Sequence, residues 1–137
     1  MQLLVNHIYL CANKGIGRET AKVLANLGAT LLICARDETR GKKCVHELIE
    51  ESGNMNIRLY VMDLANFSSI QLAASEIIRK EPRLDVLLNN AGIGYAEGNM
   101  TKDGNELLYS LPYTAADVGC KRTTWAHISL RKSFFRY

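Results

Sequence analysis

Apolar residues follow two alternating patterns between residue 5 and about residue 106. Short apolar runs typical of buried strands predict strands at residues 5–10, 30–34, 57–62 and 84–88. Longer stretches with apolar positions every three or four residues predict helices at residues 16–27, 38–52 and 68–80. Strands that alternate with helices in this way indicate βαβ units around a parallel sheet.

The sequence also marks the ends and the apolar faces of these helices. Gly28 and Gly53 are expected to end the first two helices, and Pro82 breaks the third. The apolar positions expected to form one face are Ile16, Val23, Leu24 and Leu27 in the first helix, Cys44, Val45, Leu48 and Ile49 in the second, and Ile70, Leu72, Ala73, Ile77 and Ile78 in the third.

The predicted elements define a fold class and a domain organisation. We expect an α/β fold of the Rossmann type with three layers, in which four parallel strands lie in the order 3-2-1-4, with two helices on one face and one on the other. Residues 1–106 form this domain, which we expect to be truncated and to leave part of one sheet face uncovered. Residues 107–137 continue neither period and are interpreted as a divergent C-terminal tail, for which poor order is one open possibility.

Composition and charge exclude several classes of protein. Apolar residues make up 47% and charged residues 23%, which is ordinary for a globular chain and argues against a disordered one. The net charge is +3, and it comes from the tail, where five cations against Asp117 give +4 while residues 1–106 sum to −1. No basic stripe interleaved with aromatic residues accompanies this charge, so we expect no nucleic-acid partner.

Cysteine usage and hydropathy bear on the compartment. The four cysteines have no C-x-x-C pairing and no metal-ligand spacing with histidine, so we expect neither a disulfide framework nor a metal site. The apolar opening of the chain is shorter than the roughly 20 residues that span a bilayer, and no transmembrane segment is expected. These observations predict a cytoplasmic chain.

A glycine-rich turn lies between the first predicted strand and the first predicted helix. Glycine there lets backbone amides and a helix N-terminus approach a pyrophosphate, although glycine turns without a ligand are also common. The candidate binding residues in this turn are Asn13, Lys14, Gly15, Ile16 and Gly17.

Arg36 follows the second predicted strand, at the position that selects between the two nicotinamide dinucleotides. An acidic residue there suits a ribose hydroxyl, whereas arginine suits the 2′-phosphate of NADP. Lys14 is placed to add a second cation to the same phosphate. The alternative is that Lys14, Arg36 and Asp37 are ordinary surface charges.

Polar residues also follow the third and fourth predicted strands. Because ligands bind beyond the carboxyl ends of parallel strands, these residues are expected to converge on one crevice, with Asp63 accepting from the adenine amino group. The alternatives are a turn or helix cap at Asp63 and strand-stitching side chains in the asparagine pair that ends at Asn90. The candidate residues are Asp63, Leu64, Asn90, Ala91 and Gly92.

Taken together, these motifs over about residues 8–106 resemble the short-chain dehydrogenase/reductase family. Arg36 and the stretches 81–86 and 101–104 are similar to the retinol dehydrogenase and carbonyl reductase-like branch. The resemblance implies NADP(H) as cofactor. It also implies hydride exchange with a retinoid, steroid or other alcohol or carbonyl substrate in the full-length family.

Two departures from the family pattern limit what the resemblance implies. Leu10 and Cys11 stand where the family has Thr-Gly, and a Cβ at Cys11 opposes a turn that needs positive φ. No tyrosine is followed four residues later by lysine, so the family's proton relay is absent and we assign no catalytic residue.

We therefore expect a cofactor-binding but inactive chain, with self-association through exposed apolar surface as a further expectation. A non-enzymatic alternative is an interaction fragment that docks on a full-length relative by adding a strand. An incomplete gene model, a splice variant or an altered reading frame would each produce such a tail, and the sequence does not choose among them.

Overall fold

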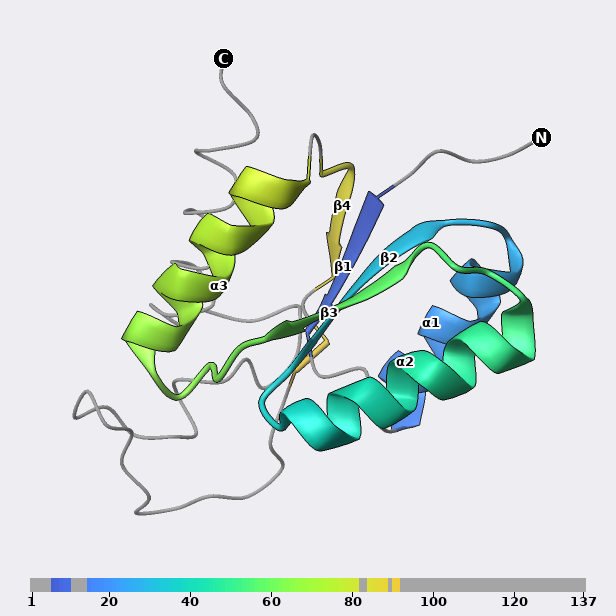
Figure 1. Cartoon of the computed structure of the whole chain (residues 1–137), viewed down its shortest axis with the longest axis horizontal. Coiled ribbons are helices and arrows are strands. Elements are labelled where there is room, and N and C mark those ends of the chain that lie inside the picture. The colour runs from blue at the N-terminus through green and yellow to red at the C-terminus, as the bar shows by residue number, and fades with distance from the viewer. Residues whose placement is uncertain (1–5, 11–14, 82–83, 89, 92–137) are drawn as a thin grey trace. The chain divides into compact units, whose positions relative to one another are not determined.

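The computed structural model describes residues 6–10, 15–81, 84–88 and 90–91 (Figure 1). The chain divides into two compact units, one of Met1–Val61 with Arg83–Leu88 and the other of Met62–Pro82 with Asn89–Tyr137. Among the described residues, the first unit holds the sheet and two helices, and the second holds one helix. The predicted tail, residues 107–137, and its boundary at residue 106 lie outside the described residues.

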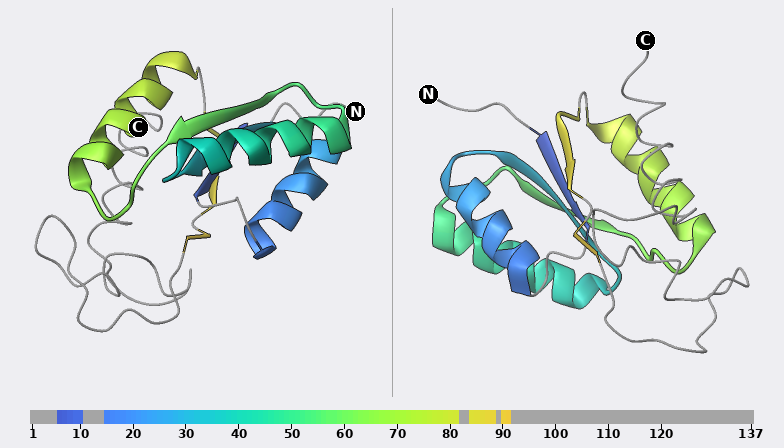
Figure 2. Two further views of the ribbon diagram at one scale, coloured as in Figure 1. Left: turned by 60° about the horizontal axis from the view of Figure 1, so that its bottom comes forward. Right: turned by 180° about the vertical axis from the view of Figure 1, so that it is seen from behind.

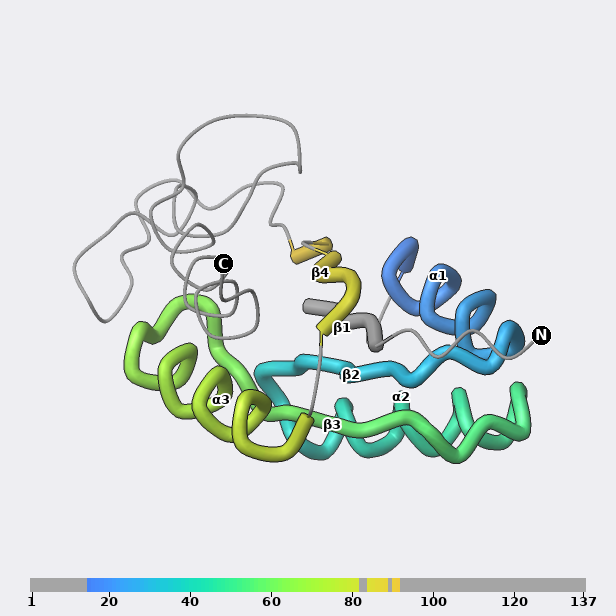
Figure 3. The backbone as a smooth tube through the Cα atoms, turned by 90° about the horizontal axis from the view of Figure 1, so that it is seen from above, coloured from blue at the N-terminus to red at the C-terminus, as the bar shows by residue number. Residues whose placement is uncertain are grey.

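The first unit is built on a parallel sheet. Its strands are β1 (Asn6–Leu10), β2 (Thr30–Ala35), β3 (Ile57–Val61) and β4 (Val86–Leu88). Within the described residues their order is β3-β2-β1-β4, and Figure 3 shows β2 and β3 side by side. Every pairing is parallel. The predicted fold class and strand order are confirmed, and β4 is shorter than expected.

Two helices lie side by side on one face of this sheet, as the views in Figure 2 show. They are α1 (Gly15–Asn26) and α2 (Glu38–Ser52). Alternate residues of β2 face them, and the shared core consists of Ala21, Ala25, Ala29, Leu31, Ile33, Cys44, Leu48 and Ile57. The sheet and both helices of the unit are therefore held by one apolar core.

The predicted apolar face of α1 is wrong. Ile16, Val23 and Leu27 are 81%, 59% and 56% exposed, and only Leu24 of the predicted face packs against the core. The buried positions are Gly17, Ala21 and Ala25, spaced four residues apart. Small side chains let the helix lie close to the sheet, so the larger apolar residues of α1 are turned away from it.

In α2 the predicted face is confirmed. Cys44 and Leu48 are buried, and their neighbours Val45 and Ile49 pack against the core. A Cβ at Gly41 would lie 2.5 Å from Cδ1 of Leu59, so α2 lies close to the sheet because this position has no side chain.

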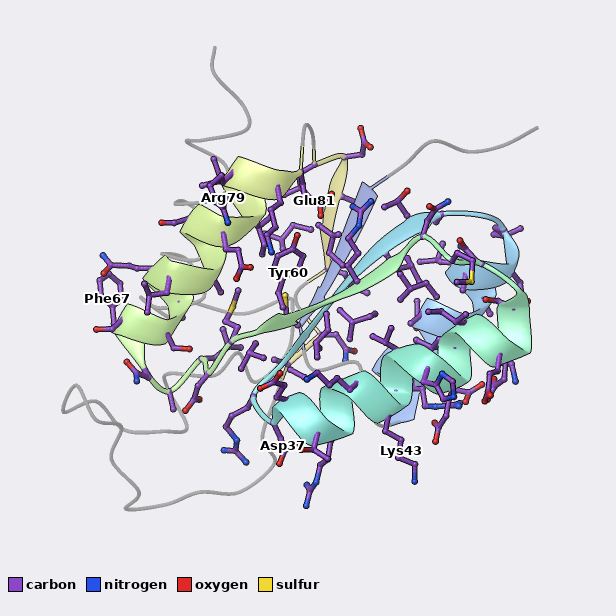
Figure 4. All side chains as sticks on the ribbon, viewed as in Figure 1. Asp37, Lys43, Tyr60, Phe67, Arg79 and Glu81 are labelled. Atoms are coloured by element: carbon purple, nitrogen blue, oxygen red, sulfur yellow. The ribbon has the colours of Figure 1, made fainter. Side chains whose placement is uncertain are left out.

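Polar groups cap both ends of α2. At its start, where Figure 4 labels Asp37, the carboxylate accepts a hydrogen bond from the Arg40 amide at 2.9 Å. At its end Gly53, with φ of 67°, donates its N–H to the Ile49 carbonyl. The predicted stop at Gly53 is confirmed.

The second unit contains α3 (Phe67–Lys80). Asn66 caps it by accepting from the amides of Ser68 and Ser69. Its buried residues are Ile70, Ala73, Ala74 and Ile77. Leu72 and Ile78 were expected on this face, but they are 73% and 36% exposed because they lie beside the buried stripe, whose members are three or four residues apart.

Among the described residues, no helix is long and apolar enough to cross a membrane.

Asn54 joins two turns at the amino-terminal edge of the sheet. Its side-chain amide donates to the carbonyls of Ala25 and Ala29, at 3.1 and 2.8 Å, and its Oδ1 accepts from the Asn56 amide at 2.9 Å. One side chain therefore holds the α1–β2 turn against the α2–β3 turn.

Replacing the side-chain amide of Asn54 by a carboxylate tests whether it holds the two turns together. Asn54→Asp should lower the free energy of unfolding by about 2 kcal/mol, because two carbonyls lose their donor and face a carboxylate instead. Asn56→Asp, an exposed position two residues away, is the matched control and should change little. Urea denaturation of both variants measures the difference, and equal losses would contradict the role assigned to Asn54.

Candidate dinucleotide-binding site

The register of the sheet brings strand ends together at one edge. Leu10 pairs with Cys34, Ala35 pairs with Val61, and β4 ends at Leu88, opposite Tyr9. Segments that leave these strands therefore start from one edge, as expected for a ligand site in a parallel sheet.

The predicted site residues are divided between the two units. Gly15, Ile16, Gly17 and Arg36 belong to the first unit, and Asp63, Leu64, Asn90 and Ala91 belong to the second. The register shows that the first group lies near the shared strand edge. Asn13, Lys14 and Gly92, together with Cys11, lie outside the described residues.

Gly15 opens α1 with a backbone that favours glycine. Its φ is 57°, in the left-handed region, although a Cβ there would meet nothing within 4 Å. Glycine is therefore favoured at position 15 by the backbone conformation and not by a lack of space for a side chain. No acidic side chain lies in the first turn of α1, so the unpaired amides and the helix dipole there favour an anion.

The other two residues of this turn differ in burial. Gly17 is buried on the side of α1 that faces the core, where a glycine permits close helix–sheet packing. Ile16 is 81% exposed, so its contribution to a ligand site is its backbone or an apolar surface.

Arg36 follows β2 directly and is exposed. Within the described part of the chain it forms no salt bridge, because the nearby Asp37 caps α2. A guanidinium without a carboxylate partner at this edge is suited to a phosphate.

Arg18, in the same glycine-rich segment, has a different environment. Its Nη2 lies 2.6 Å from Oε1 of Glu51 and 3.2 Å from Oε2 of Glu47, both on α2. The second oxygen of Glu51 lies 2.8 Å from Nζ of Lys22. Hydrogen bonds from Lys22 and Arg18 lower the pKa of Glu51, so the carboxylate is ionised at neutral pH and the interaction persists.

This set of ion pairs was not predicted from the sequence, although a signal exists. Arg18 and Lys22 are four residues apart on one helix, and Glu47 and Glu51 are four apart on the next. Such spacing places each pair on one helix face. To connect the basic pair with the acidic pair, one would also need to know that α1 packs against α2.

Asp63 forms the turn that was considered as its alternative role. Its Oδ1 accepts from the Ala65 amide at 2.9 Å, and its own amide donates to Oγ of Ser69 at 3.0 Å. Leu64 is buried within this turn. The predicted contact of Asp63 with adenine stays a prediction.

Asn90 and Ala91 are the last of the predicted site residues that the structure describes. Ala91 is buried and Asn90 is half-buried. A backbone with so small a side chain as Ala91 suits a close approach by another group.

Two other kinds of site, a metal site and a surface recess, were compared with the predicted one. No cluster of three potential metal ligands occurs among the described residues. A recess of about 320 Å³, whose lining includes Gly28, Asn54 and Asn56, lies at the opposite edge of the sheet from Arg36. It is therefore not the predicted site.

Comparisons with known proteins identify a family. The short chain dehydrogenase family matches residues 6–110. Human dehydrogenase/reductase SDR family member 13 is 42% identical over 82 residues, which are 60% of this chain and 22% of that protein. Mouse retinol dehydrogenase 11 is 38% identical over 96 residues, 70% of this chain and 30% of the relative. The chain thus spans less than a third of the length of these curated relatives.

Solved structures agree with this match. A short-chain dehydrogenase from Sphingobium yanoikuyae in complex with NADPH has a TM-score of 0.73 and 26% identity, covering 94% of this chain and 48% of that one. A metagenomic short-chain oxidoreductase in complex with NADP has a TM-score of 0.69 and 25% identity, covering 95% of this chain and 54% of that one. The family resemblance expected from the motifs is confirmed.

The turn at Asp63 generates a test on stability. Asp63→Ala should lower the free energy of unfolding by about 1 kcal/mol, because the Ala65 amide loses its acceptor. Asp63→Asn keeps an oxygen acceptor and should cost less. Chemical denaturation compares the two, and equal destabilisation would show that the charge, and not the hydrogen bond, matters.

Proposed function

This chain belongs to the short chain dehydrogenase family, and from that membership we propose that residues 1–106 bind NADP(H) at the carboxyl edge of the sheet. The observation that carries the proposal is that Gly15 and Arg36, both in the first unit, lie on segments that follow two paired strands. Gly15 opens α1 with positive φ, and Arg36, which has no salt-bridge partner among the described residues, follows β2, whose Cys34 pairs with Leu10. Two solved relatives in complex with NADPH and NADP support it.

The residues present fit an anionic dinucleotide. Exposed amides at the start of α1, without an acidic neighbour in the first turn, are donors for a pyrophosphate. Arg36 supplies a cation for the 2′-phosphate. In this proposal Asn13, Lys14, Gly15, Ile16 and Gly17 surround the pyrophosphate, with Lys14 also near the 2′-phosphate.

The sequence motif adds five candidate residues from the second unit to the proposal. Asp63 accepts from the adenine amino group with an oxygen that does not hold its turn, and Leu64 supports that turn from its buried position. Asn90, Ala91 and Gly92, which follow β4 in the sequence, are proposed as further cofactor-binding residues from the motif. The cofactor, when bound, supplies or accepts hydride, and these residues bind and orient it.

Turnover is a separate matter from binding. The retinol dehydrogenases among the relatives suggest hydride transfer between NADP(H) and an alcohol or carbonyl as the activity of the family branch. The 137 residues contain no Tyr-x-x-x-Lys, so we propose that this polypeptide by itself binds cofactor without catalysis. A cytoplasmic location is part of the same proposal.

An interaction role is the second candidate. Val86 on β4 is 43% exposed, and Ile16 and Val23 on α1 are 81% and 59% exposed. Such surface favours self-association or docking on a full-length relative through the β4 side of the sheet. Sedimentation of the purified chain over a concentration series tests it, and a monomer at every concentration would exclude self-association.

Cofactor preference is the direct test of the NADP(H) proposal. Calorimetry should show tighter binding of NADPH than of NADH by about 10- to 100-fold, the value of a charge-assisted contact to one phosphate. Arg36→Ala should remove most of this preference while leaving weak binding of both cofactors. Arg58→Ala removes the same charge at an exposed position of β3. It is the control and should keep the preference. Equal affinities in the unmodified chain would refute the assignment of Arg36.

The catalytic part of the proposal has its own measurement. The purified chain should show no NADPH-dependent reduction of retinal or of small carbonyl compounds, because it lacks a lysine-assisted tyrosine. NADPH absorbance is followed over time, with a mock purification as control. Turnover that copurifies with the chain and exceeds the mock preparation would contradict this expectation.

A further inference from the structure

The sheet-facing side of α1 consists of small residues. Gly17, Ala21 and Ala25 are buried there, whereas Ile16 and Val23 are exposed and Leu24 is half-buried against the core. Helix packing is normally specified by side chains that interdigitate as ridges and grooves. A surface of glycine and alanine permits close approach but presents few such ridges, so another contact is needed to define the rotation of α1.

The ion pairs between α1 and α2 provide that contact. Arg18 reaches both Glu47 and Glu51, which lie on successive turns of α2, through one nitrogen at 3.2 and 2.6 Å. Lys22, one turn further along α1, lies 2.8 Å from the other oxygen of Glu51. We call these four side chains the α1–α2 clamp. Because two residues on each helix take part, the clamp restrains rotation as well as separation.

Burial and position distinguish the clamp from isolated surface pairs. The Arg18 side chain is 21% exposed, compared with 50% for Lys80 in the surface pair that it forms with Glu76. An exposed pair contributes little, but a network of partly shielded charges with a shared guanidinium is directional. Arg18 also follows Gly17 directly, so the clamp acts at the start of α1.

We infer that Arg18 is a positioning residue for the cofactor: through Glu47 and Glu51 it fixes the first turn of α1, and with it the amides of Gly15 to Gly17 that receive the pyrophosphate. This inference rests on the proposed NADP(H) function. Hydrogen bonds to a phosphate depend on amide direction, so a small rotation of the helix weakens several of them together.

A competing role makes the opposite prediction. A guanidinium near a helix N-terminus is itself a natural partner for a phosphate. If Arg18 bound the phosphate directly, removing the two carboxylates would release it and strengthen cofactor binding. If Arg18 positions α1, removing them weakens binding.

The experiment measures NADPH affinity by fluorescence titration, at a temperature where circular dichroism shows each variant folded. Arg18→Gln and the double variant Glu47→Gln with Glu51→Gln should each weaken binding by about fivefold, the upper end for one ion pair. Arg18→Lys should recover part of the loss. The NADPH to NADH preference should stay unchanged, since Arg36 is intact. The control Glu76→Gln with Lys80→Gln removes a surface pair at 2.6 Å and should have no effect.

Hydrogen exchange of the unliganded chain separates this inference from the proposed function. In Arg18→Gln the amides of residues 15–20 should exchange faster, while those of residues 21–26 change less. Unaltered exchange, or a carboxylate double variant that binds NADPH as well as the unmodified chain, would overturn the inference while leaving the proposed function intact. If the unmodified chain binds no NADPH, the proposed function and the cofactor role of Arg18 are both wrong, even where exchange changes as expected.

Discussion

The parallel pairing of β1 with β2 is the constraint on which the candidate site depends. With Leu10 opposite Cys34, the segment that leaves β1 for α1 and the segment that leaves β2 for α2 start from the same edge of the sheet. A shift of this register by one residue would turn Leu31 and Ile33 out of the core that they share with α1 and α2. The apolar core therefore fixes the register, and the register brings Gly15 and Arg36 to one edge.

Much of the first unit could be predicted from the sequence because its signals are local. Buried strands such as Thr30–Ala35 are continuous apolar runs, and α2 has its apolar stripe between a capping Asp37 and a terminating Gly53. The face of α1 could not be predicted in this way, since the largest residues were taken as the buried ones. Close packing selected Gly17, Ala21 and Ala25 instead, and only the distance between helix and sheet, a tertiary quantity, decides between the two stripes.

The candidate site shows the same division between local and tertiary information. Gly15 was predicted from a motif, and its positive φ agrees with the turn that the motif requires. At Asp63 both the ligand role and the turn role were open, and the turn is present, since a carboxylate two residues before an amide forms it without help from the rest of the fold. The contacts of Arg18 join residues 29 and 33 positions apart, so the four-residue spacing within each helix does not by itself connect the two helices.

The net charge of +3 says little about function, because the partners of each cation differ. Arg18 and Lys22 face the carboxylates of α2, and Asp37, the acid nearest to Arg36 in sequence, caps that helix. Helix α2 thus holds Glu47 and Glu51 toward α1 near its end, while its first turn engages Asp37, the residue next to Arg36. The same helix therefore keeps one arginine in a structural role and leaves the other available for an anion, a separation that depends on the position of charge along α2 and not on its sum.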